Sequence, residues 1–412
     1  MSNALPARQR REDAARELAA RLATTAPLWR PPCFYDDPPW IAGHPRLAAA
    51  LLALGDGELA SLEDDPDTLT RWLADALPAI GTLVTAADAC LDDDTLPVPL
   101  AVPETHGRDV PGRKWQQALA FAAACGVPHG PLVDWCCGKA HLGRLLSQLH
   151  GVPVTGIERN HALCVDGNAL AARDRLPVQL VEADALTVSA PDARLDHAAH
   201  AVALHACGDL HLALLRTASD AGVAALDVAP CCYHLTRDYH WQPLSVALAG
   251  CALQPLQLTR DDLRLAVQET VTASARVVAQ TRQLAGWRLG FDALQRDVRG
   301  IDAALPTPSR PARVLADGFA AFCADMAAHH RLPLPAGVDY PRFEQLGSRR
   351  QARMRRLQLV RHACRRPLEV LLAADRALWL TERGYQVQLS PFCRRELTPR
   401  NLLLRARRRS AA

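Results

Sequence analysis

Acidic side chains follow three apolar segments in the middle of the chain, and a glycine turn follows the first. Asp134 lies in PLVDWC and precedes the turn CCGKA, whose Gly138 is four residues further on. Glu158 ends VPVTGIE and Asp184 ends VQLVEAD. Such a turn offers backbone N–H groups to a polar ligand, and a carboxylate at the second strand end can accept both ribose hydroxyls. With Asp184 in reach of an adenine amino group, the pattern predicts a site for S-adenosylmethionine (SAM); the plainer alternative is that Glu158 and Asp184 cap helices.

Two later segments, LHACGDL (204–210) and DVAPCCYHL (227–235), combine histidines with cysteines. Methyl transfer to a hydroxyl needs a base that works near neutral pH, which suits histidine. We expect His234, in slight preference to His205, to be that base, and Tyr233 to stack on a nucleobase or orient the acceptor. The full set of candidates on the two segments is His205, Cys207, Asp209, Pro230, Cys231, Cys232, Tyr233 and His234.

The cysteines leave other interpretations open. Cys231 or Cys207 could attack a pyrimidine ring as a nucleophile. A zinc ion could be bound by these cysteines together with His205 and His234, but adjacent cysteines seldom serve one tetrahedral ion and the chain has no C-x-x-C pair, so we expect no metal. The plainest alternative is that they are small buried residues, which is what we expect of Cys136 and Cys137.

The elements that must position these residues alternate between strand and helix. Apolar runs at 131–136, 152–158, 178–184, 200–206 and 223–229 are separated by helical patterns at 140–150, 161–173 and 209–221. Apolar strands alternating with helices predict a parallel sheet covered on both faces, an α/β fold that binds ligands at the carboxyl ends of its strands.

The flanking segments are predominantly helical. We expect an N-terminal helical domain (1–105), a methyltransferase-type core (106–245), a helical Arg-rich insert (246–367) and a closing segment (368–412) whose strands 385–392 and 401–406 rejoin the sheet. Thr259 and Asp262 form a capping box that should begin a long helix reaching about Val298.

DWCCGKAHLGRLL, LHACGDL and DVAPCCYHL resemble the methyltransferase-domain family of bacterial SAM-dependent methyltransferases and animal methyltransferase-like proteins. The resemblance extends to GRKW (112–115), RDDLRLA (260–266), GYQVQLSPF and LTPRNLLL, and spans about residues 110–410. It implies a class I, Rossmann-like methyltransferase with a seven-stranded sheet. By residue it implies Asp134, Gly138, Lys139, His141 and Glu158 for the cofactor, and the loops of His205 and Cys231 for the active centre. We also expect Cys136, Leu142, Asp184 and His205 to contact the cofactor.

One motif position departs from the family. The usual form is D-x-C-x-G-K-G-H-L, and Ala140 replaces its second glycine. If that position needs a positive φ, cofactor affinity should suffer. A more distant similarity to the tRNA acceptor-stem ribose methyltransferases, in G-K-x-x-L, H-x-C-G and Cys-Cys-x-His, implies RNA as the acceptor.

Charge is distributed unevenly along the chain. Residues 1–105 carry 17 acids and 8 bases, whereas residues 246–412 carry 14 acids and 28 bases. Eight arginines and no acid lie between Arg349 and Arg366, and more follow in the tail, which predicts a polyanionic partner, RNA above all, unless these are simply solvated helix faces. A protein or small-molecule acceptor, or a SAM- or RNA-binding module without activity, is the alternative.

The number of cysteines and the hydropathy of the sequence indicate the cellular compartment. Thirteen cysteines, two pairs of them adjacent, do not form a disulfide framework. No apolar stretch is long enough for a membrane span or a signal peptide, so we expect a reduced cytoplasmic enzyme without membrane contact.

Overall fold

The computed structural model describes residues 7–92, 95–98, 100–196, 199–250, 256–268 and 274–409. The chain divides into two compact units. The sheet unit comprises the described residues of Met1–Thr24, Thr82–Val271 and Arg365–Ala412, and the helical unit those of Thr25–Gly81 and Thr272–Cys364. This grouping differs from the four sequence segments, because residues 1–105 contribute to both units.

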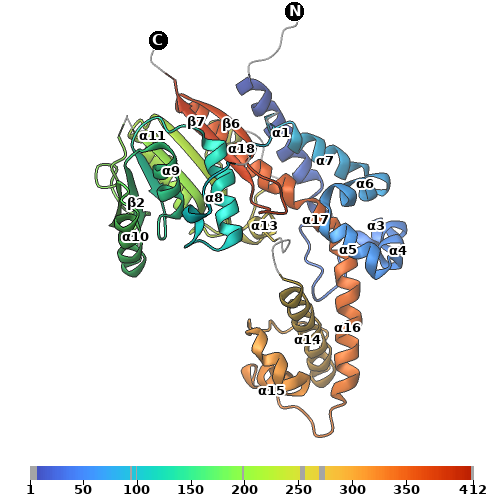
Figure 1. Cartoon of the computed structure of the whole chain (residues 1–412). Helices are drawn as coiled ribbons and strands as arrows, with labels where there is room; N and C mark the ends of the chain where they lie inside the picture. Colours follow the sequence, from blue (N-terminus) through green and yellow to red (C-terminus); the bar gives the residue numbers. More distant parts are fainter. Residues whose placement is uncertain are drawn as a thin grey trace, which may run out of the picture. The chain divides into compact units, whose positions relative to one another are not determined.

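The sheet unit contains seven strands in the order β3-β2-β1-β4-β5-β7-β6. Of these, β6 and β7 lie side by side (Figure 1). β1 to β5 run parallel, while β7 is antiparallel to both β5 and β6. This order is typical of class I methyltransferases and confirms the expected α/β fold and the return of the last two strands to the sheet. The strands are β1 (Leu132–Trp135), β2 (Val154–Glu158), β3 (Val178–Glu182), β4 (His200–Cys207), β5 (Ala225–Cys231), β6 (Tyr385–Pro391) and β7 (Leu402–Arg408).

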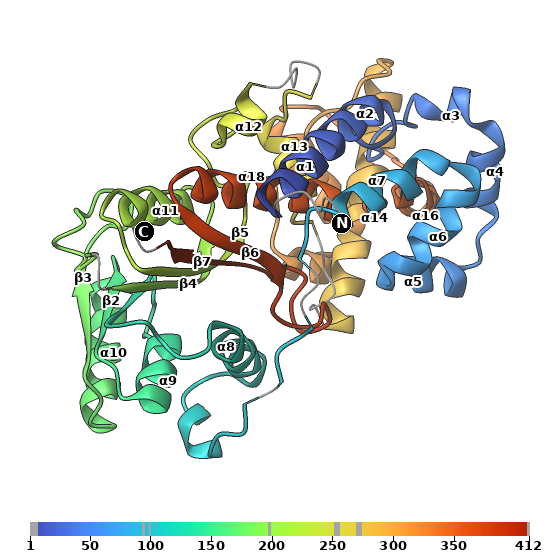
Figure 2. The same cartoon turned by 90° about the horizontal axis from the view of Figure 1, so that it is seen from above.

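Helices cover both faces of this sheet. Figure 2 shows α8 (Gly112–Cys125), α9 (His141–His150) and α10 (His161–Arg173) on one face, and α11 (Asp209–Asp220) and α18 (Arg365–Glu382) on the other. β1 and β5 are buried along their whole length, as continuous apolar strands between two helical layers should be. The remaining helices of this unit are α1 (Ala7–Thr24), α12 (Val246–Ala249) and α13 (Arg260–Leu265), with the 3₁₀ turn η1 (Glu104–Gly107).

The prediction of one long helix after Thr259 is wrong. The capping box of Thr259 and Asp262 is present, but α13 ends at Leu265, and a separate helix begins at Ala275. The part of the expected helix at 269–273 lies outside the described residues.

The helical unit is built around an aromatic core that includes Trp287, Phe291, Phe322 and Phe343. Its helices are α2 (Ala26–Trp29), α3 (Trp40–Gly43), α4 (Pro45–Ala53), α5 (Asp56–Asp64), α6 (Pro66–Ala76), α14 (Ala275–Arg299), α15 (Gly318–His329), α16 (Tyr340–Leu357) and α17 (Leu359–Ala363), with the 3₁₀ turn η2 (Ala312–Asp317), while α7 (Pro78–Asp88) crosses the boundary between the units.

The Arg-rich segment is largely neutralised inside the chain. Four of its arginines form ion pairs within the helical unit, namely Arg350–Asp292, Arg353–Asp37, Arg355–Glu63 and Arg356–Asp56. Arg366 pairs with Glu369 in the sheet unit. The uneven charge along the sequence therefore reflects, in large part, pairing of basic C-terminal helices with acidic N-terminal ones.

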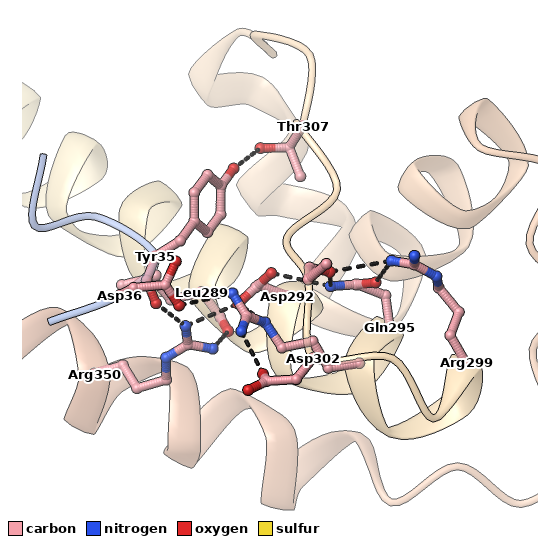
Figure 3. Close-up of polar contacts among 11 residues, drawn as sticks. Tyr35, Asp36, Leu289, Asp292, Gln295, Arg299, Asp302, Thr307 and Arg350 are labelled. Atoms are coloured by element: carbon pink, nitrogen blue, oxygen red, sulfur yellow. Dashed lines mark hydrogen bonds and ion pairs between the residues drawn. The ribbon is translucent and has the colours of Figure 1, made fainter.

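A fully buried carboxylate lies at the centre of this pairing. Asp292 accepts hydrogen bonds from Arg350 (2.8 Å), Arg296 (3.0 Å) and Gln295 (3.0 Å), and Arg350 also donates to the carbonyl of Tyr35 (Figure 3). A buried carboxylate is tolerated only with such partners. These arginines stabilise the helical unit.

Candidate functional site

Asp134 fastens the first loop to the helix that follows. Its Oδ2 accepts a hydrogen bond of 2.9 Å from the backbone N–H of Gly143, in the first turn of α9. The side chain is only 3% exposed, and burial raises the pKa of Asp134 to about 7. A Cβ at position 143 would approach Asp134 Oδ2 to 3.0 Å and Val154 to 2.8 Å, so this close contact requires glycine. Asp134 thus sets where α9 begins relative to β1.

Ala140 adopts the left-handed conformation that the family's glycine would favour. Its φ is 52° and its ψ is 40°, it precedes α9 directly, and it is fully buried. A non-glycine residue in this region costs roughly 1–2 kcal/mol. The position therefore does need a positive φ, and the chain accommodates alanine there.

The other residues of the first motif have mixed surroundings. Lys139 Nζ forms an ion pair of 2.8 Å with Asp166 on α10. Leu142 is buried in the apolar core, and His141 is half-buried, with burial and the nearby Arg144 lowering the pKa of its imidazole. Cys136 is half-buried with φ 57°, and burial raises its pKa to about 12.

Glu158 ties the first two loops together. Its Oε2 accepts from the backbone N–H of Gly138 (3.1 Å), and its Oε1 from that of Asn160 (2.8 Å). Asn160, not Glu158, caps α10 through its own side chain. Asp184 is exposed and accepts from the N–H of Leu186 (2.9 Å).

A cavity of about 400 Å³ opens beside these carboxylates at the carboxyl ends of the parallel strands. Residues from the ends of β1, β2 and β4 and from the loops after β3 and β5 line this cavity. Its lining is Cys136, Ile157, Glu158, Arg159, Asp184, Ala185, Leu186, Cys207, Asp209, Leu210, Leu235, Thr236 and Arg237. A cavity lined by apolar side chains together with the carboxylates of Glu158, Asp184 and Asp209 is the kind of site that holds a nucleoside.

The loops after β4 and β5 are packed directly on each other. Gly208 donates to the carbonyl of Cys231 (3.0 Å), and a Cβ at Gly208 would lie 1.9 Å from the carbonyl oxygen of Leu235. Asp209 accepts from the N–H of Arg237 (2.9 Å), which holds the second loop against the start of α11. The glycine and the acid of CGDL therefore shape the second loop.

His205 is oriented by a residue that the sequence did not point to. Its Nε2 lies 3.0 Å from Gln117 Oε1 on α8, and Gln117 Nε2 donates to the carbonyl of Leu397 (3.0 Å). Because the amide nitrogen already faces a carbonyl, its oxygen accepts from His205 Nε2–H. The lone pair of the imidazole is then on Nδ1. Burial, Arg400 and Lys114 lower the pKa of His205, which favours this neutral form.

Tyr233 and His234 differ sharply in exposure. Tyr233 is 2% exposed, with Arg376 lying over its ring and His211 against its edge. This ring has no face open for a nucleobase to stack on. His234 is half-buried, and its Nδ1 is buried without a hydrogen-bond partner in the described structure.

Three cysteines of the two loops converge. The Sγ atoms of Cys207 and Cys231 are 3.5 Å apart, and the sulfurs of Cys207, Cys231 and Cys232 all lie within 4.8 Å of one another. The hydrogen bond to Cys207 raises the pKa of Cys231, while that from Cys207 lowers the pKa of Cys232. The structure thus brings together cysteines from the two segments that the sequence identified as candidates.

A second cavity, of about 380 Å³, lies on the α11 side of these loops. Asp209, Leu186, Thr236 and Arg237 line both cavities, so the two are neighbours. Arg376 also lines it; this arginine is 4% exposed and donates to His211 Nε2 (2.9 Å). No sequence pattern indicated Gln117 or Arg376, because each lies on a helix more than 80 residues from the histidine that it contacts.

Within the described part of the chain, no helix has the length and apolar character that a membrane span requires.

The chain is similar to a known protein family over part of the sheet unit. Residues 119–238 match the family model described as a methyltransferase domain. Among solved structures, one from Galdieria sulphuraria, described provisionally as a sarcosine dimethylglycine methyltransferase, aligns over 76% of this chain and 90% of its own at 12% identity. Its TM-score of 0.25 is too low to support any argument. A search of curated proteins gave no match. The matched segment runs from α8 to just beyond the Cys-Cys-Tyr-His loop, so this part of the sheet unit is similar to a methyltransferase domain.

Proposed function

We propose that this chain transfers the methyl group of SAM to RNA. The methyltransferase domain implies SAM as the donor. The observation that carries the proposal further is the 400 Å³ cavity, which joins Glu158 and Asp184 to the loop of Cys207 and Asp209.

The cofactor would lie along the carboxyl edge of the sheet. Glu158 accepts the ribose hydroxyls, Asp184 the adenine amino group, and the turn from Cys136 to Ala140 faces the methionine end with its backbone N–H groups. Asp134 acts through that turn, since it holds the start of α9. Bound SAM supplies an electrophilic methyl group on a sulfonium.

His205 is the base that the geometry favours. Gln117 holds its Nε2–H, so the lone pair that would take the proton of an acceptor hydroxyl is on Nδ1. A base oriented by a third group is the usual arrangement for acid–base work. His234, the base preferred on sequence, has no such orienting partner in the described structure.

Unpaired cations around these loops support a phosphate-bearing acceptor. Lys114 and Arg400 act on His205, and Arg264 and Arg400 act on His234. Among the described residues none of the three has a carboxylate partner; Arg400 donates to the carbonyl of Val267 (3.1 Å). Lys114 and Arg264 are exposed. We therefore assign RNA binding to Lys114, Arg264 and Arg400 and not to the Arg-rich segment, whose arginines are largely paired within the chain.

The test uses purified protein, methyl-labelled SAM and lysate from a strain that lacks the gene. Label in RNA, sensitive to nuclease and lost in Glu158→Gln, supports the proposal. Lys114→Ala and Arg264→Ala should each weaken RNA binding and reduce its salt dependence. The control Arg175→Ala removes an exposed arginine that precedes β3, at the amino end of that strand. It should leave both RNA binding and its salt dependence unchanged.

Other outcomes would redirect the assignment. Label only in protein or small molecules refutes RNA and leaves the methyltransferase standing. SAM binding with no label in any fraction, and equally none with Ala140→Gly, indicates a binding module without activity.

A further inference from the structure

The cluster of Cys207, Cys231 and Cys232 has a geometry that its sequence position does not explain. Cys231 and Cys232 are adjacent, and adjacent residues of a strand point to opposite sides. Here both sulfurs lie within 4.8 Å of each other and of Cys207. Something other than regular strand geometry brings them together.

The backbone departs from ordinary geometry on both loops to produce this convergence. Cys232 leaves β5 with φ 47°, a left-handed conformation that costs a non-glycine residue roughly 1–2 kcal/mol. On β4, His205 has φ 69°, and the pairing with β5 shifts register between Leu204 and Cys207, so that Cys207 comes opposite Cys231. Strain of this kind is concentrated at functional sites.

The sulfur spacing matches that of a tetrahedral metal ion. A Zn–S bond of about 2.3 Å places two sulfur ligands about 3.8 Å apart. The Cys207–Cys231 distance is 3.5 Å, and the other two are at most 4.8 Å. A disulfide needs only two of these thiols, whereas a metal ion accounts for all three.

The cysteine cluster is accessible from the 400 Å³ cavity through one of its members. Cys231 is 3% exposed, while Cys207 and Cys232 are half-buried, and Cys207 lines the 400 Å³ cavity. Thiolates select soft or borderline ions such as Zn²⁺ over Mg²⁺ or Ca²⁺.

We propose that Cys207, Cys231 and Cys232 bind one Zn²⁺ ion as three thiolate ligands. Three protein ligands leave the fourth tetrahedral position for water or a substrate group, as in catalytic rather than structural zinc sites. The proposal does not depend on which acceptor is methylated.

The test is metal uptake by the full chain, freed of metal with a chelator under reducing conditions. Addition of Zn²⁺ followed by dialysis should leave about one ion per chain. Co²⁺ should produce an intense thiolate-to-metal charge-transfer band. Cys207→Ser and Cys232→Ser should each lower metal retention at least tenfold. Cys90→Ser is the matched control: Cys90 is buried, lies outside the cluster and bonds the carbonyl of Ala86, a contact that serine retains.

A second measurement needs no variant that could fail to fold. Zn²⁺ should protect the half-buried Cys207 and Cys232 of the native chain from alkylation, read by peptide mass spectrometry, and leave the half-buried Cys136 unprotected. Unchanged alkylation of Cys207 and Cys232, or metal retention equal in native, Cys207→Ser and Cys232→Ser proteins, overturns the proposal. Since no methyl acceptor is present, failure here leaves the proposed function intact.

Discussion

Replacement of Glu158 by glutamine is the most direct probe of the cofactor site. The two side chains have the same shape, but glutamine offers one acceptor oxygen instead of two. Glu158 uses both oxygens, one toward the N–H of Gly138 and one toward that of Asn160. In Glu158→Gln, the amide NH₂ must face one of these backbone donors, and the charge available to the ribose diol is gone.

The magnitude follows from the loss of at least one charge-assisted hydrogen bond. Such bonds contribute about 1.5–3 kcal/mol, which corresponds to a rise in the Kd for SAM of about 10- to 150-fold. Isothermal titration calorimetry with SAM and with S-adenosylhomocysteine measures this directly. Both ligands should weaken together, because the affected contact is with the ribose that they share.

Glu182 provides the matched control. It pairs in register with Glu158 on the neighbouring strand β3, is exposed, and does not line the cavity. Glu182→Gln should bind SAM as the native chain does. If Glu158→Gln remains folded and its Kd stays within twofold of the Glu182→Gln value, Glu158 does not hold the ribose and the placement of the cofactor is wrong.

Three further predictions follow from the same contacts. Gln117→Ala should lower kcat about 10- to 100-fold at unchanged SAM affinity, because His205 loses its orienting partner. The control Gln116→Ala, at the exposed neighbouring residue, should leave kcat unchanged. If the two variants have the same kcat, His205 has no part in the mechanism. Asp292→Ala should destabilise the helical unit by about 3–5 kcal/mol, since Arg296 and Arg350 lose their buried carboxylate. Faster amide hydrogen exchange in α14 would show this loss of stability. The control Asp302→Ala, at an exposed partner of Arg296, should leave the exchange rates nearly unchanged. Burial raises the pKa of Asp134 to about 7 from an unfolded value of about 3.9. The folded chain therefore binds the extra proton between these values, and its free energy of unfolding should fall as pH rises through this window, by at most about 1.4 kcal/mol per pH unit from this group. Urea unfolding should show that Asp134→Asn lacks this component, and identical pH profiles would contradict the assignment.

The α/β core was predictable because its signals are local. Short apolar runs separated by helical patterns define β1 to β5, and parallel strands bring their carboxyl ends to one edge. Glu158 and Asp184 could therefore be placed beside one cavity from their positions alone. The departure at Ala140 was also visible, although only the structure showed that alanine takes the left-handed conformation there.

Long-range pairing was not predictable, because it depends on which distant segments pack together. The charge total of the Arg-rich segment predicted a polyanion surface, yet Arg355 pairs with Glu63, 292 residues away. In the same way, Gln117 reaches His205 across 88 residues, and Tyr233 lies beneath Arg376 on α18.

The sequence by itself determined the alternation of strands and helices in the parallel half and the glycine turn and acids that follow its strands, since both depend on residue types at short spacing. Only the tertiary structure decided which charges neutralise one another, which histidine is oriented, and that three cysteines from two loops meet at one point. The physical reason is that side-chain pairing is set by packing between elements far apart in the chain, which neither periodicity nor composition records.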